Sequence, residues 1–248
     1  MKSTLFFIDA SLAATLYAET RGEYHTKRAF EAGQDSESRQ MNAIRECAVS
    51  KIHTCVYPII EHLKKDGKEN ATLRRESTNA LGRLKAVEAR EPILAMLAKE
   101  QDLFVKSAAI RALGNIGNKA DIKTISPFLT DKEALLRRQA ARALFDINDK
   151  SAAAETSGKI AGEKDDYTRA EMLNTALQHE GGKVEHALAL GKILQSPDRG
   201  ARLRAAEVLG NYKNKEALGD LERAFQVETD LQVRAAIHHA ISETTFGN

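Results

Sequence analysis

The sequence predicts an all-α solenoid of short helical hairpins, because one pattern recurs along most of the 248-residue chain. The pattern is an acidic or amide residue, a basic residue four positions later, and an apolar residue seven positions after that. Successive basic residues are separated by 32, 31, 32, 33 and 32 positions. Self-similarity at this period is typical of repeat arrays, in which each unit buries its apolar face against its neighbours. The acidic or amide members and their basic partners are Asn70 and Arg74, Asp102 and Lys106, Glu133 and Arg137, Asp165 and Arg169, Asp198 and Arg202, and Asp230 and Arg234.

The acidic or amide residue of each pattern is expected to cap the first helix of a hairpin. Short polar side chains at this position accept hydrogen bonds from the exposed N–H groups of the first turn. Apolar residues at helical spacing in residues 102–113 predict one buried stripe, and Gly114 and Gly117 are expected to end that helix. Because every repeat carries the basic residue, we expect it to contact neighbouring loops or caps, not a ligand.

A second helix is expected to follow in each of about six hairpins. Pro58, Pro92 and Pro127 predict its start in the first three, because proline suits a first helical turn. The last repeat has a first helix alone, at residues 230–243. This half-repeat is expected to close the array, since terminal repeats are usually atypical.

The N-terminal residues allow two interpretations. In residues 1–18, Lys2 precedes an apolar run, and Leu-Tyr-Ala at 16–18 matches the cleavage site of a secretory signal peptide. Asp9 interrupts the run, and its apolar residues also fit an amphipathic capping helix. Residues 19–37 are polar and predict a linker, so the array would span 38–248. Cleavage would make the protein periplasmic or secreted, in a bacterium, whereas a structural helix would make it cytoplasmic.

Composition argues against several classes of function. The net charge is +2, aromatic residues make up 5% of the chain and Trp is absent, which disfavours nucleic-acid binding. No later apolar run approaches the roughly 20 residues of a membrane span. The chain lacks nucleotide-binding, nucleophile-elbow and zinc-protease motifs, so neither an enzyme nor a cofactor is predicted.

The two cysteines, Cys47 and Cys55, leave two alternatives open. On one continuous helix they would be about 12 Å apart, too far for a disulfide. The repeat register instead places Cys47 near the end of a first helix and Cys55 just ahead of the second helix, where a bridge is possible. A disulfide is expected if the protein is exported, and two buried thiols otherwise.

Residues 103–118, which read Leu-Phe-Val-Lys-Ser-Ala-Ala-Ile-Arg-Ala-Leu-Gly-Asn-Ile-Gly-Asn, resemble the HEAT repeat in its short subtype named after phycobilisome lyase. Residues 203–211 and 231–237 are similar. The resemblance covers about 70–248 and extends more weakly back to 38. It implies a right-handed superhelix of antiparallel helix pairs, with the second helices lining the concave side. Most members of the family are scaffolds and adaptors, and a few are enzymes.

The resemblance implies a noncatalytic scaffold or adaptor that binds another protein on its concave face. The alternative is a catalytic or non-catalytic subunit of a modifying or lyase complex, which would need a deep pocket with convergent polar groups and shifted pKa values. Deoxyhypusine hydroxylase, a HEAT-type enzyme, needs several His-Glu pairs to hold two irons, whereas this chain has His179-Glu180 alone, so no metal is predicted. The abundant lysines favour an acidic or phosphorylated partner, although a solvated charged face is the default interpretation. The expected contact residues are Glu91, Lys99, Lys123, Lys159, Lys183, Lys192, Lys215 and Arg223.

Overall fold

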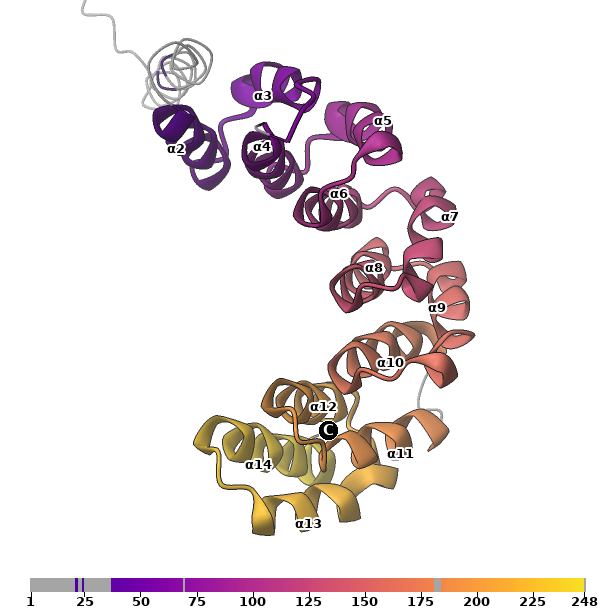
Figure 1. Ribbon diagram of the computed structural model, residues 1–248. Coiled ribbons are helices and arrows are strands. Elements are labelled where there is room, and N and C mark those ends of the chain that lie inside the picture. Colours follow the sequence, from indigo (N-terminus) through magenta and orange to yellow (C-terminus); the bar gives the residue numbers. More distant parts are fainter. Residues whose placement is uncertain (1–20, 22–23, 25–36, 69, 181–183, 248) are drawn as a thin grey trace, which may run out of the picture. The chain divides into compact units, whose positions relative to one another are not determined.

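The computed structural model describes residues 21, 24, 37–68, 70–180 and 184–247 (Figure 1). Within these residues every regular element is an α-helix or a short 3-10 helix, and none is a strand. The all-α prediction is therefore confirmed. The segment 1–18 lies outside the described residues, as does most of 19–37. Glu37, which was expected to end the linker, is instead the first residue of a helix.

The chain divides into two compact units, Met1–Ala112 and Leu113–Asn248. In the N-terminal unit each first helix is followed by a 3-10 turn and a second helix, as the repeat predicts. The last helix of this unit contains the boundary between the units. The elements are α2 (Glu37–Val49), η2 (His53–Cys55), α3 (Val56–Leu63), α4 (Ala71–Arg83), η3 (Val87–Ala89), α5 (Arg90–Lys99) and α6 (Leu103–Ile116).

The C-terminal unit continues the same alternation and ends on a first helix without a partner, as expected. Its second helices are less regular than those of the N-terminal unit. The elements after α6 are η4 (Lys119–Asp121), α7 (Ile122–Ile125), η5 (Ser126–Thr130), α8 (Ala134–Ile147), α9 (Lys150–Ser157), η6 (Ile160–Gly162), α10 (Asp166–Glu180), α11 (Val184–Ile193), α12 (Arg199–Tyr212), η7 (Lys215–Ala217), α13 (Leu218–Val227) and α14 (Leu231–Phe246).

First helices form the inner layer of the C-terminal unit. α8, α10, α12 and α14 pack side by side in chain order, and Figure 1 shows α9, α11 and α13 spread farther apart on their other side. Small residues allow the close approach: a Cβ on Gly210 of α12 would lie 3.1 Å from the Cα of Ala240 in α14. This unit therefore curves toward its first helices. The expectation that second helices line the concave side is wrong for this unit.

Four of the six expected caps are present. Asp102, Asp165, Asp198 and Asp230 each accept a hydrogen bond from a main-chain N–H three residues later, at 2.8 to 3.0 Å. The other two predictions are wrong. The side-chain amide of Asn70 donates to the carbonyl of Asp66 at 2.7 Å, and the side chain of Glu133 accepts no capping bond.

The helix-ending residues are partly as expected. Gly117 follows α6 with φ +75°, a conformation that favours glycine, so it ends the helix. Gly114 does not end α6 but lies inside it. Pro58 and Pro92 are in the first turns of α3 and α5, whereas Pro127 lies in η5 and interrupts a second helix that had already begun at α7.

Substituting Gly114 by alanine is expected to destabilise the protein by about 1–3 kcal/mol, the usual cost of overpacking. The new Cβ would lie 2.6 Å from the Cα of Ala143 in α8, so the backbones must separate. Gly219→Ala in α13 is the matched control, because its Cβ would meet only the end of Arg223 at 3.5 Å. Urea denaturation of both variants makes the comparison. Equal stabilities would contradict the close helix contact.

Cys47 and Cys55 form a disulfide, with Cα atoms 6.3 Å apart. Cys47 lies in α2 and Cys55 in η2, and both are fully buried. The bridge therefore ties a first helix to the start of its second helix, where the repeat register placed the pair.

The double substitution Cys47→Ala/Cys55→Ala is expected to lower the free energy of unfolding by about 2–3 kcal/mol, because a short closed loop is released in the unfolded chain. Chemical denaturation with and without reductant measures the change. The variant should be insensitive to reductant, whereas the parent protein loses stability when reduced. Two thiols that alkylate in the native, non-reduced protein would contradict the bridge.

Candidate binding pocket at a hairpin junction

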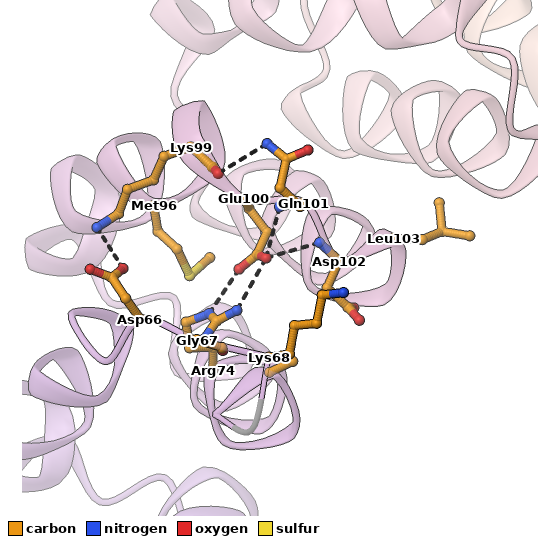
Figure 2. Close-up of a pocket in the computed structure, with 11 residues that line it drawn as sticks. Asp66, Gly67, Lys68, Arg74, Met96, Lys99, Glu100, Gln101, Asp102 and Leu103 are labelled. Atoms are coloured by element: carbon orange, nitrogen blue, oxygen red, sulfur yellow. Dashed lines mark hydrogen bonds and ion pairs between the residues drawn. The ribbon is translucent and has the colours of Figure 1, made fainter.

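Arg74 contacts neighbouring loops, as expected for the basic residue of the repeat. From α4, its Nε and Nη2 donate to the two carboxylate oxygens of Glu100, at 2.8 and 3.1 Å. Its Nη1 donates to the carbonyls of Lys65 and Gly67, at 2.8 and 2.7 Å. Figure 2 shows the paired guanidinium and carboxylate between the two loops. Arg74 thus joins the loop before its own helix to the loop that follows its hairpin.

Glu100 in turn holds the start of the next first helix. Its Oε1 accepts hydrogen bonds from the main-chain N–H groups of Gln101 and Asp102, both at 2.9 Å. Both partners of the ion pair are almost fully buried, with side chains 7% and 5% exposed. We call such an Arg and the Glu that lies 26 residues after it a junction clamp.

The clamp occurs in alternate hairpins. Arg137 binds both oxygens of Glu163 at 2.6 and 2.9 Å, and Arg202 binds both oxygens of Glu228 at 2.7 and 3.2 Å. In each case Nη1 of the arginine also donates to two carbonyls of the preceding loop. The separation is 26 residues in every clamp.

Repeats without a clamp lack the acidic residue. The positions 26 residues after Lys106 and Arg169 hold lysine and glutamine. A sequence signal distinguishes the two classes, since each clamp glutamate stands two residues before a capping aspartate. This Glu-x-Asp signal occurs at 100–102, 163–165 and 228–230, and it marks the clamp glutamates in the sequence.

Two of the clamp carboxylates, Glu100 and Glu228, have lowered pKa values. Burial alone would raise the pKa of Glu100, but hydrogen bonds from Arg74 and from the N–H groups of Asp102 and Gln101 outweigh it. The pKa of Glu228 is lowered chiefly by its hydrogen bond from Arg202. Both groups therefore stay ionised at neutral pH. They are poorly suited to general acid–base catalysis, which favours a pKa near the working pH.

These pKa values predict acid sensitivity. A carboxylate with a lowered pKa in the folded protein stabilises it fully above the unfolded value, near 4.5, and this stability is lost as the pH falls through the folded pKa. We expect Glu100→Gln/Glu228→Gln to flatten the decline in stability below pH 4.5. Urea midpoints of parent and variant from pH 7 to pH 3 test this. Parallel pH curves would contradict the assignment.

A pocket of about 710 Å³ opens against the first clamp, between the loop after α3 and the junction of α5 with α6. Its apolar lining residues are Ala71, Met96 and Leu103. Lys99 donates to Asp66 at 2.8 Å on one side of the pocket, and this bond lowers the pKa of Asp66. The pocket therefore combines apolar walls with an ion-paired base and a charged rim.

A smaller pocket of about 290 Å³ lies against the second clamp, in the C-terminal unit. It is lined by Arg137 and Glu163 together with Lys159 and Lys164. A clamp with lysines nearby is therefore a recurring site within this fold.

The comparisons with known proteins agree with this repeat architecture. A family model described as HEAT repeats matches residues 56–145 and 104–173. This chain is a HEAT-repeat protein. A search of the curated proteins finds no match to it.

Solved structures resemble the HEAT-repeat chain in fold. The complex of CpcE and CpcF of phycocyanin lyase from Nostoc sp. PCC7120 is 16% identical with a TM-score of 0.60, covering 88% of this chain and 94% of that one. Human deoxyhypusine hydroxylase in complex with glycerol is 16% identical, with a TM-score of 0.44 and coverages of 93% and 87%. An engineered protein is 20% identical, with a TM-score of 0.47 and coverages of 90% and 69%.

Two of the eight sequence-predicted contact residues line a clamp pocket, and they line different ones. Lys99 and Lys159 line the two clamp pockets, and Lys183 lies outside the described residues. The others are exposed and line neither clamp pocket, and Arg223 is ion-paired with Asp220 on its own helix. These exposed residues are Glu91, Lys123, Lys192, Lys215 and Arg223.

The structure gives two further findings for the described part of this HEAT-repeat chain. No group of three or more His, Cys, Asp or Glu side chains there has a geometry that could hold a metal ion. No helix in that part has the length and apolar character needed to cross a bilayer.

Proposed function

We propose that this HEAT-repeat protein is a noncatalytic scaffold or adaptor, and that the 710 Å³ clamp pocket of its N-terminal unit receives a segment of a partner protein. The observation that carries the proposal is the combination of apolar walls and a charged rim in one pocket. Binding pockets typically measure about 300–1,000 Å³ and are mostly apolar with a few placed polar groups. The pocket lies where two hairpin junctions meet, so a partner segment can extend along the edge of the stack.

The rim of the pocket favours an acidic segment. Lys68 and Lys99 are exposed there, and Asp66 neutralises only Lys99. An apolar side chain flanked by acidic residues complements this arrangement, since complementary charge speeds encounter and sets register. The rim thus fits the acidic partner expected from the lysine-rich composition.

The charge states in the pocket support binding more than catalysis. Asp66 and Glu100 both have lowered pKa values and are already bonded to cations. A general base poised near neutral pH needs the opposite shift. A subunit of a modifying or lyase complex would use the same partner-binding step, and the fold likeness to CpcE and CpcF adds no residue-level argument for it.

The disulfide supports export. Structural disulfides persist in the periplasm and outside cells and are rare in the cytosol. We therefore place the protein in an oxidising compartment, with residues 1–18 removed as a signal peptide. Intact mass of protein from its native host tests both points together. A mass that includes residues 1–18, with two free thiols, would overturn this placement.

Capture from extracts of the native host tests the pocket. The bait variants are Lys68→Glu/Lys99→Glu at the pocket and Lys192→Glu/Lys215→Glu on the second-helix side of the C-terminal unit, which make the same charge change. We expect a partner bound by the parent protein to fall at least tenfold with the pocket variant and to stay unchanged with the other. Recovery that is unaffected by the pocket variant, or lost only with the other, would refute the pocket assignment.

A steric variant separates shape from charge. Ala71→Trp is expected to fill part of the pocket and reduce capture without altering the charged rim. Circular dichroism and thermal melting check that each bait is folded. Undiminished capture by a folded Ala71→Trp variant would exclude insertion of a partner side chain.

A further inference from the structure

A third pocket, of about 330 Å³, lies on the first-helix side of the C-terminal unit. It is formed by α8, α10 and α12, and no clamp contributes to it. Its lining residues recur at helical spacing on each of the three helices, so each helix offers one continuous face. They are Arg142, Phe145 and Asp146 from α8, Tyr167, Glu171 and Asn174 from α10, and Arg204 and Glu207 from α12.

Glu171 holds the three helices together at this pocket. Its side chain is 2% exposed, and both carboxylate oxygens are occupied. Oε1 accepts from Nε of Arg142 at 2.8 Å, and Oε2 pairs with Nη2 of Arg204 at 3.1 Å. Arg142 also donates to the hydroxyl of Tyr167 at 2.6 Å. The ionic groups of the pocket are therefore largely committed to one another.

The ring of Tyr167 packs against residues of two neighbouring helices. The guanidinium carbon of Arg138 lies 4.0 Å from the centre of its ring. On α12, a Cβ at Gly200 would lie 3.0 Å from Cδ2 of the ring, so glycine allows this close contact without a shift of the ring. Tyr167 is thus a wall of the pocket that packs against neighbouring helices.

Asn174 is the exception in this network. The residue is 3% exposed, and its main-chain carbonyl accepts from the hydroxyl of Tyr212 at 3.2 Å. Its side-chain amide makes no hydrogen bond to any described residue. The unpaired Nε of Arg204 is sealed from solvent, whereas the Asn174 amide is not. Because Asn174 lines the pocket, its amide opens into the pocket. A nearly buried amide that lines a pocket and has no partner within the fold is available to a ligand, whose hydrogen bonds would replace those that solvent makes.

The equivalent residue of the N-terminal unit is satisfied within the fold. Asn79 stands five residues after Arg74, as Asn174 stands five residues after Arg169. The side-chain oxygen of Asn79 accepts a hydrogen bond from Arg111 on the next first helix. The residue that corresponds to Arg111 beside Asn174 is Glu207, which is paired with Arg204. Asn79 and Asn174 therefore occupy the same position in their repeats and differ in whether the next first helix supplies a partner.

We propose that this pocket binds the main chain of an extended peptide segment from a partner protein, with the Asn174 amide pairing with one peptide group. A side-chain amide offers N–H donors and a carbonyl acceptor, which complement the C=O and N–H of a peptide bond. The lining has two guanidinium groups and three carboxylates, so a phosphate or acidic side chain meets repulsion and a neutral group is favoured. Phe145 and Tyr167 supply aromatic surface for a neighbouring side chain.

This inference rests on the proposed function only in taking a protein as the occupant, because the site lies in the other unit. The test uses peptides selected from a random display library against the full-length chain. Their affinity is measured by fluorescence anisotropy for the parent protein and for Asn174→Ala, Asn174→Asp, Asn79→Ala and Lys68→Glu/Lys99→Glu.

We expect Asn174→Ala and Asn174→Asp to weaken binding at least tenfold, and the other two variants to leave it unchanged. Methylating peptide nitrogens one at a time should identify one N–H whose loss reduces binding as much as Asn174→Ala does. Melting curves that match the parent protein show that each variant is folded.

Recovered peptides that bind folded Asn174 variants as tightly as the parent protein would overturn the assignment, as would a selection that recovers no binder. Sensitivity to Lys68→Glu/Lys99→Glu alone would also overturn it while supporting the clamp pocket. A further outcome is that only the Asn174 variants weaken peptide binding, while capture of the host partner is unchanged by Lys68→Glu/Lys99→Glu. That result would support this site and refute the clamp-pocket assignment.

Discussion

Replacing Arg74 by alanine is expected to lower the free energy of unfolding by about 3–5 kcal/mol, the cost of breaking a buried ion pair. The substitution leaves the carboxylate of Glu100 buried at 5% exposure without its cation. It also removes the donors to two carbonyls of the preceding loop, at Lys65 and Gly67. Urea denaturation followed by circular dichroism gives the change in stability.

The repeat provides its own control for this experiment. Lys106 occupies the same position on the next first helix, and 26 residues later the chain has lysine instead of glutamate. Lys106→Ala is expected to change stability by no more than about 0.5 kcal/mol, as for most surface substitutions. Equal losses for Arg74→Ala and Lys106→Ala would mean that the basic position acts through the repeat itself and not through the clamp.

The second large effect is expected at Glu171. Glu171→Gln should destabilise the protein by about 1.5–3 kcal/mol, the range for hydrogen bonds to charged groups. Glutamine keeps the shape but brings an N–H₂ group against the donors of Arg142 or Arg204. Hydrogen exchange should accelerate in α8, α10 and α12 of the C-terminal unit, because Glu171 joins these three helices.

Glu207→Gln is the control for Glu171→Gln. Glu207 also pairs with Arg204, at 3.1 Å, but its side chain is 45% exposed. Exposed ion pairs contribute about 0–1 kcal/mol, so little change is expected. If both variants lose the same stability, burial of the Glu171 carboxylate is not what makes the network strong.

The sequence predicted local features of the repeats well. The caps at Asp102, Asp165, Asp198 and Asp230 depend on a side chain and the helix turn that follows it, and all four are present. Glu133 fails as a cap although its position in the repeat is the same. Glutamate is not among the residues preferred at an N-cap, so the repeat register suggested a role that the side chain does not favour.

Only some residues of the clamp pocket were predictable from the sequence. Lys99 was expected on a binding surface and lines the clamp pocket, whereas Lys192 and Lys215 are exposed away from the clamp pockets. Arg74 was expected to reach neighbouring loops, and it does. Its partner Glu100 lies 26 residues away, and a pairing across two loops depends on how consecutive hairpins stack.

The sequence by itself determined the helical hairpins, their period and most of their caps, because these depend on interactions between residues a few positions apart. Tertiary structure alone decided that an arginine and the glutamate 26 residues later pair in a clamp, that the C-terminal unit curves toward its first helices, and that Asn174 lacks the partner that Asn79 has. The physical reason is that these properties depend on distances between helices. Small residues such as Gly114 and Gly210 set those distances through contacts with residues about 30 positions away.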